Sequence, residues 1–365
     1  MLAAQGDSAK ARSLYEEALA VHREVDNKIG ISTALGNIGL MLKAQGDASL
    51  AMKRYEEAME LSRTIGDRVG VAWQLNSMGI LLAEQGELEG ARARFEECLN
   101  MRREIGQKDG VAQALINLAA ADLDKGDLES SRRLIEEGLA VAREVGGKHH
   151  VAIALKLVGD ILVARGDPAG ARKNYDAALA ICTEIGLHSL AATCRTGLAR
   201  LSIEEGRPAE AVLPLREAAL AFDKEKSPDD QAAAHALLAR ALLGEGRKAE
   251  AREALENARA ALGRTQNPPV RLAVGLVGAR LDAATGQSAR ALRSLEAIAA
   301  DASRYGYMGL HLEARLVWGE VEIAAGRGDA GRARLEALER EAAARGFGLF
   351  VARAAAARTA ARARG

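Results

Sequence analysis

Apolar residues recur at the three- and four-residue spacing of amphipathic helices, in paired segments that a glycine separates. Around Gly46, this pattern predicts one helix over residues 30–45 and a second over 48–65. Gly46 suits the end of the first helix, because a left-handed residue there is favourable when it has no side chain. Asp47 can cap the second helix by accepting hydrogen bonds from its free amides. The unit is therefore a helical hairpin, in which helix A precedes the glycine and helix B follows it.

The glycine of this hairpin recurs every 40 residues through the whole chain. It occupies Gly6, Gly46, Gly86, Gly126, Gly166, Gly206, Gly246, Gly286 and Gly326. A second series at Gly66, Gly106, Gly146 and Gly186 marks the end of helix B. So strict a period predicts a stacked solenoid, which grows by adding units and can form one long domain.

Three further columns of the repeat predict how each hairpin packs. Helix A carries a small residue at Gly39 and its equivalents, and helix B carries one at Ala51 and its equivalents. Four residues beyond Ala51 comes a large side chain, Tyr55 in this unit. The two helices must cross at the small residues, because bulkier side chains would separate close-packed helices.

The residues Ile38-Gly39, Ala51, Tyr55 and Ala58 resemble the signature of the tetratricopeptide repeat family. The usual unit of that family has about 34 residues, so a 40-residue unit implies longer helices. The resemblance implies an all-α, right-handed superhelical solenoid of antiparallel helix pairs, with helix A lining the concave face. We expect about eight full repeats, a leading half repeat and a C-terminal capping helix.

The repeat changes character along the chain. Residues 1–205 form a regular sub-array, and residues 206–346 form a divergent one that continues it, in which Arg207 and Arg247 replace the capping acid. We expect residues 347–365 to cap the C-terminal end of the array, with a closing helix from Phe347 to Arg364. Residues 1–6 read as the last turn of a helix A, which suggests a fragment or an upstream domain. The array resembles the C-terminal half of bacterial signalling proteins that begin with a Ser/Thr kinase or winged-helix domain.

Charge and cysteine content narrow the function. The net charge is zero, with 28 acids and 23 bases in residues 1–186 and the reverse bias in the remainder. This asymmetry is too mild for a general nucleic-acid binder. Three cysteines without close pairs argue against a disulfide framework. Because neither a signal peptide nor a long apolar run is present, we expect a cytoplasmic protein without membrane partners.

One groove-facing column of helix A carries three consecutive arginines, Arg200, Arg240 and Arg280. Such a stripe suits an acidic peptide in the rear half of the solenoid, because guanidinium groups bind oxyanions with two parallel hydrogen bonds. The alternative is a solvated surface. Arg200 has Glu204 one turn further on as a pairing partner, whereas Arg240 and Arg280 have no acid in that place.

In the front half, Asn37, Ser77 and Asn117 share one column, with Trp73 and Asn76 nearby. Asparagine on a concave helix can hold a peptide backbone, since its amide both donates and accepts. In the tetratricopeptide repeat family, which this chain resembles, an asparagine at this position of helix A often has that role. The alternative is a local bond between neighbouring repeats, and for Trp73 packing between repeats.

The sequence contains no catalytic residues, cofactor fingerprint or metal-binding motif that we recognise. The leading interpretation is a non-catalytic interaction scaffold that binds an extended peptide or a partner helix in its concave groove, as the regulatory or sensory part of a bacterial signalling protein. The alternative is a receptor for a small peptide or metabolite whose binding changes the curvature of the solenoid. That alternative requires a closed superhelix with an enclosed pocket.

Overall fold

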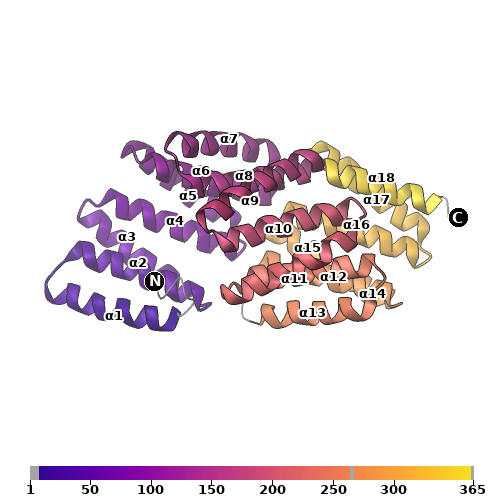
Figure 1. Cartoon of the computed structure of the whole chain (residues 1–365), viewed down its shortest axis with the longest axis horizontal. Helices are drawn as coiled ribbons and strands as arrows, with labels where there is room; N and C mark the ends of the chain where they lie inside the picture. The colour runs from indigo at the N-terminus through magenta and orange to yellow at the C-terminus, as the bar shows by residue number, and fades with distance from the viewer. Residues whose placement is uncertain (1–7, 264–266, 363–365) are drawn as a thin grey trace.

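The structure is a computed structural model that describes residues 8–263 and 267–362. These residues form eighteen α-helices and no strand (Figure 1). The helices are α1 (Ser8–Glu24), α2 (Lys28–Ala44), α3 (Ala48–Thr64), α4 (Arg68–Glu84), α5 (Leu88–Glu104), α6 (Lys108–Lys125), α7 (Leu128–Glu144), α8 (Lys148–Arg165), α9 (Pro168–Ile185), α10 (His188–Glu204), α11 (Pro208–Lys224), α12 (Pro228–Gly244), α13 (Lys248–Leu262), α14 (Pro268–Ala284), α15 (Ser288–Tyr305), α16 (Met308–Ala324), α17 (Gly328–Ala344) and α18 (Gly348–Arg362).

The order of the helices confirms the predicted solenoid. Eight hairpins run from α2–α3 to α16–α17, with α1 as the leading half repeat and α18 as the closing helix. The predicted turn at residues 1–6 and the last residues of the predicted closing segment lie outside the described residues. The boundary at 205/206 falls in the turn of the α10–α11 hairpin, and the division into two sub-arrays stays a prediction.

The helix ends follow the residues that the sequence places there. Gly46 adopts a φ of +85°, which a side chain would make unfavourable. The Asp47 carboxylate accepts a hydrogen bond from the Leu50 amide at 3.1 Å and so caps α3. At the equivalent place before α5, Glu87 makes no such bond. The shorter acids and not the glutamate therefore supply the side-chain caps.

Small residues let the two helices of a hairpin approach, as predicted. A Cβ atom added to Gly159 of α8 would lie 2.6 Å from the Tyr175 ring of α9. Gly39 and Gly79 face Tyr55 and Phe95 in the same way. The large residue of helix B therefore packs onto the bare backbone of helix A.

The solenoid curls until its rear repeats meet its middle repeats. Helix α16 contacts α6, and α18 contacts α8, beside whose C-terminal end it lies in Figure 1. The Tyr307 hydroxyl donates a hydrogen bond to the Ala83 carbonyl at 3.0 Å, across 224 residues of sequence. Leu128 shares an apolar cluster with Leu312 and Phe347. The array therefore closes on itself as a superhelix.

None of the helices in the described part of the chain combines the length and the apolar character that a membrane span requires.

Candidate functional site

The inner side of the curled superhelix holds a half-open cavity of about 420 Å³, which we call the inner cavity. Its walls come from the even-numbered helices α6 to α18, so helix A lines the concave face as the sequence predicts. Apolar walls include Leu237, Leu276, Leu310 and Phe350. Charged residues also reach it: Asp124, Lys156, Asp160, Arg200, Arg240, Arg280 and Glu313.

Three of these charges, Arg240, Arg280 and Glu313, belong to an ion network that joins the inner helices. Glu313 of α16 pairs with Arg280 of α14 at 2.7 Å and with Arg353 of α18 at 2.7 Å. Glu204 of α10 pairs with Arg240 of α12 at 2.8 Å, and it lies 3.5 Å from Arg353. The network therefore links five inner helices of the rear half.

Two of the predicted arginines are paired, contrary to the expectation from sequence. Glu204 binds Arg240 on the next inner helix and not Arg200 on its own helix. Arg280 binds Glu313 and, at 3.2 Å, Glu320. Arg200 instead has neither a hydrogen bond nor an ion pair among the described residues. The sequence offered Glu204 as a partner for Arg200 and no acid for Arg240 or Arg280, but the observed partners come from neighbouring helices and not from one turn along the same helix.

A second cluster lies around Asp160 in the front wall of the inner cavity. Its carboxylate pairs with Lys156 at 2.8 Å and accepts a hydrogen bond from the Tyr175 hydroxyl at 2.7 Å. Asp124 on α6 faces the same region without a hydrogen bond or ion pair among the described residues. The Asp124 side chain is exposed to the solvent of the cavity, but the surrounding protein still raises its pKa to about 7, with the nearby Lys156 opposing this shift. Asp124 and Arg200 are thus the unpartnered charges of the described cavity wall.

Sequence reasoning missed Lys156, Glu313 and Arg353, although the repeat register carries a signal for them. Lys156 stands in the column of Asn76, where the neighbouring repeat has Ile116. Glu313 and Arg353 stand in the column of Trp73. A charge in a column of otherwise uncharged residues indicates a partner on an adjacent helix, and a comparison of columns would have shown it.

The front-half residues make local contacts. The Asn117 amide donates a hydrogen bond to the Asn76 side-chain oxygen at 2.8 Å and so joins α6 to α4. The Ser77 hydroxyl bonds to the Trp73 carbonyl, and the Trp73 ring packs edge-on against Tyr55 with centroids 6.5 Å apart. Asn37 is half-buried and has no such bond among the described residues. The local alternative therefore describes the observed contacts, and a peptide-binding role for these residues stays a prediction.

Acid should weaken the ion network. Burial opposes ionisation of Glu313, but Arg353, Arg240 and Arg280 outweigh it and hold its pKa well below the ordinary 4.5. Because the pKa is depressed in the folded state, the stabilisation is complete above pH 4.5 and is lost as the pH falls through the folded value. We expect the melting temperature to fall as the pH is lowered below 4.5, measured by circular dichroism. Equal acid sensitivity of wild type and Glu313→Gln would contradict this assignment.

A sequence profile of the tetratricopeptide repeat matches residues 1–64, 30–104, 110–173 and 151–220. These matches cover more than half of the chain, which therefore belongs to the tetratricopeptide repeat family. The profile describes a repeat and no catalytic domain. Curated protein sequences yield no match.

Several solved structures have a similar fold. A Rap protein complexed with Competence and Sporulation Factor has a TM-score of 0.71 at 12% identity, over 94% of this chain and 96% of that one. The Rap conjugation gene regulator of plasmid pLS20, in complex with the Phr* peptide, has a TM-score of 0.59 at 14% identity, over 74% of each chain. The apo quorum sensor NprR from B. thuringiensis has a TM-score of 0.57 at 16% identity, over 81% of this chain and 83% of that one. At these identities the likeness shows the fold.

Proposed function

We propose that this chain is a non-catalytic receptor that binds a short extended peptide in its inner cavity. The observation that supports the proposal is the pair of unpartnered charges, Asp124 and Arg200, in a wall whose other charges are paired. A guanidinium binds a carboxylate through two parallel hydrogen bonds, and a carboxylate binds an ammonium group. A peptide offers both groups, with apolar side chains for Leu237 and Leu310 between them.

The size of the inner cavity favours a short peptide over a partner helix. Its volume of about 420 Å³ lies in the range of ligand pockets, whereas a helix with its side chains is about 10–12 Å wide. The similar Rap structures, which hold Competence and Sporulation Factor and the Phr* peptide, support this choice. A metabolite with one amine and one carboxylate is the second candidate, since the same two charges would bind it.

The closed superhelix offers a way to transmit binding. Contacts of α16 with α6 and of α18 with α8 hold the ring shut, and a ligand between the inner helices changes their spacing. We therefore propose a regulatory or sensory role within a cytoplasmic bacterial signalling protein, with a protein or peptide and not nucleic acid as partner. In this proposal Asn37, which has no bond partner among the described residues, is the front-half residue that contacts a longer peptide.

Reversal of Arg200 should abolish peptide binding. Wild type would be incubated with a library of synthetic peptides of five to ten residues with free ends, and retained peptides identified by mass spectrometry. We expect Arg200→Glu to lower the affinity for the retained peptides at least tenfold, because a carboxylate replaces the carboxylate-binding group. Isothermal titration calorimetry would measure the affinity. Arg240 and Arg280 are unsuitable for this test, since they hold the ion network.

The matched control is Arg340→Glu, which makes the same change on the outer helix α17 at a side chain that is 69% exposed. It should leave the affinity unchanged. The proposal fails if no peptide is retained or if both variants bind like wild type. If no peptide is retained but free amino acids bind in a parallel titration, and Arg200→Glu abolishes that binding, the second candidate is supported.

A further inference from the structure

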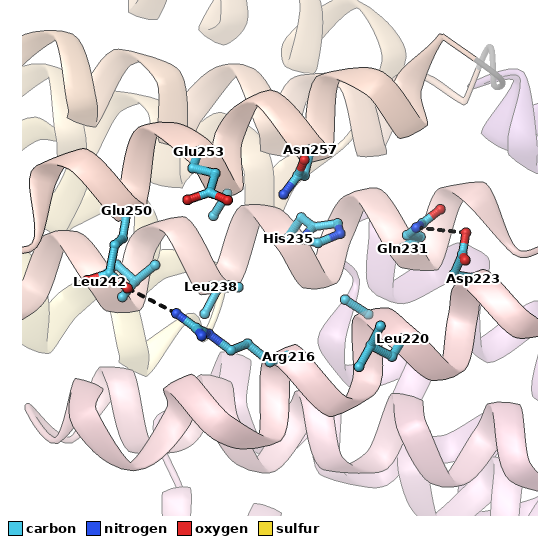
Figure 2. Close-up of a pocket in the computed structure, with 12 residues that line it drawn as sticks. Arg216, Leu220, Asp223, Gln231, His235, Leu238, Leu242, Glu250, Glu253 and Asn257 are labelled. Atoms are coloured by element: carbon cyan, nitrogen blue, oxygen red, sulfur yellow. Dashed lines mark hydrogen bonds and ion pairs between the residues drawn. The ribbon is translucent and has the colours of Figure 1, made fainter.

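A second cavity, of about 510 Å³, lies between the odd-numbered helices α11 and α13, on the outer side of α12. We call it the outer groove. Figure 2 shows His235 and Leu238 on its floor, with Leu220 on one wall and Glu253 on the other. It shares no residue with the inner cavity, because the two use different faces of α12. The outer groove is therefore an independent feature of the molecule.

His235 lines the outer groove at a place where the front repeats carry leucine. The residues at the same place in the first four hairpins are Leu35, Leu75, Leu115 and Leu155, all buried, whereas the hairpin directly before carries Arg195. Leu155 belongs to an apolar cluster that includes Leu139 of α7 and Ala178 of α9, the two odd helices beside it. Between α11 and α13 the equivalent residues are Ala219 and His235, both of which line the outer groove.

The floor of the outer groove also holds unsatisfied polar atoms. His235 Nδ1 and Gln231 Oε1 are buried atoms with no hydrogen-bond partner in the described part of the chain. Burial lowers the pKa of His235, with Asp223 opposing the shift, so the neutral ring keeps one nitrogen as an acceptor. Each unsatisfied buried polar group costs about 1–3 kcal/mol, and a ligand that supplies a donor to the groove removes part of that cost.

Two exposed leucines extend the apolar surface of α11. Leu213 and Leu220 are 64% and 65% exposed. In the earlier repeats, the position equivalent to Leu213 is occupied by Ser, Lys, Ala or Arg. The position equivalent to Leu220 is occupied there by Ala, Glu or Asn. Seven residues separate the two leucines, so they lie on one side of the helix two turns apart. That spacing matches the contact positions of a docked amphipathic helix.

The charges around the outer groove indicate the sign of its ligand. Its wall carries the acids Asp223, Glu250 and Glu253 and one base, Arg216. Glu250 pairs with Arg216 at 3.0 Å and with Arg247 at 2.6 Å. Glu253 is exposed and has no hydrogen bond or ion pair among the described residues. The excess of acid favours a basic ligand.

We propose that the outer groove docks a basic amphipathic helix of a partner protein. An apolar side chain of that helix enters the space above His235 and Leu238, and its apolar face covers Leu213 and Leu220. A lysine or arginine beside this face pairs with Glu253. The site goes beyond the proposed function, because a partner bound outside the ring leaves the inner cavity free for the peptide.

The probe is a displayed library of 18-residue helical peptides with a fixed leucine seam and randomised flanking positions, selected against the wild-type chain. We expect enrichment of helices with an excess of lysine and arginine. The affinity of the best peptide would be measured by fluorescence anisotropy. His235→Leu should weaken it at least tenfold while raising the melting temperature, since the leucine fills the groove as it does in the front repeats. Glu253→Lys should weaken it to a similar degree.

The matched control is Glu256→Lys, the same charge change on α13 at a residue outside the groove. It should bind like wild type, and so should Arg200→Glu, whose effect is confined to the inner cavity. The proposal is overturned if no helix is enriched, if acidic helices are enriched, or if His235→Leu binds equally well. Dimerisation of the wild type that Leu213→Ala and Leu220→Ala abolish would also overturn it, since the occupant would then be a second copy.

Discussion

Gly159→Leu is expected to lower the free energy of unfolding by about 3 kcal/mol or more. The Cβ alone would come 2.6 Å from the Tyr175 ring, inside the α8–α9 hairpin. Tyr175 is 1% exposed and its hydroxyl is bonded to Asp160, so the ring has no space into which it can move. The helices must therefore separate. Urea denaturation followed by circular dichroism would measure the loss.

Gly309→Leu provides the matched control for this substitution. Gly309 also lies in an inner helix, α16, but a Cβ added there meets no atom within 4 Å. Its replacement should change the urea midpoint far less than that of Gly159. If the two variants unfolded at the same urea concentration, the assignment of Gly159 to a close helix crossing would be wrong.

The fold of the hairpins follows directly from local residue patterns. Gly46 predicts a left-handed helix end and has a positive φ, and Asp47 predicts a cap and makes one. The contact of Gly159 with Tyr175 follows from their equivalence to Gly39 and Tyr55 in the repeat. Each of these features depends on interactions within one 40-residue unit, so the sequence of one unit is enough to predict it.

Closure of the superhelix could not be predicted in this way. It depends on small rotations between successive repeats, which accumulate until Tyr307 reaches Ala83. The residue pattern within one repeat does not determine the total rotation. One signal was nevertheless present. Asn27 and Asp67 cap helices α2 and α4, whereas Tyr307 and Phe347 stand at the equivalent places before α16 and α18. Aromatic residues at capping positions indicate a packing partner outside the hairpin.

The ion network shows the same limit at the level of side chains. The sequence correctly places Arg240 and Arg280 on the concave face, where they line the inner cavity. It does not show that Glu204 and Glu313 reach them from other helices. Pairing between helices depends on the spacing of the inner helices, which is set by closure. Among the described residues the unpaired arginine of the column is therefore Arg200, for which the sequence had offered Glu204 as a partner.

Glu313→Gln is expected to have the largest effect of any single change in the ion network. The Glu313 carboxylate lies between Arg280 and Arg353, and its side chain is 14% exposed. Removal of one partner from a buried ion pair leaves the other charges uncompensated, at a cost of about 3 kcal/mol. Because these arginines belong to α14 and α18, the loss should also loosen the ring. Urea denaturation would measure the first effect and small-angle X-ray scattering the second, as an increased radius of gyration.

Glu320→Gln separates this effect from the general loss of a carboxylate. Glu320 lies on the same helix and also pairs with Arg280, but its side chain is 34% exposed. An ion pair this open to water contributes less than about 1 kcal/mol, so its loss should be small and should leave the radius of gyration unchanged. Equal destabilisation by the two substitutions would mean that burial does not strengthen the pairing at Glu313. An unchanged radius for Glu313→Gln would mean that the aromatic contacts of Tyr307 and Phe347 hold the superhelix closed without the ion network.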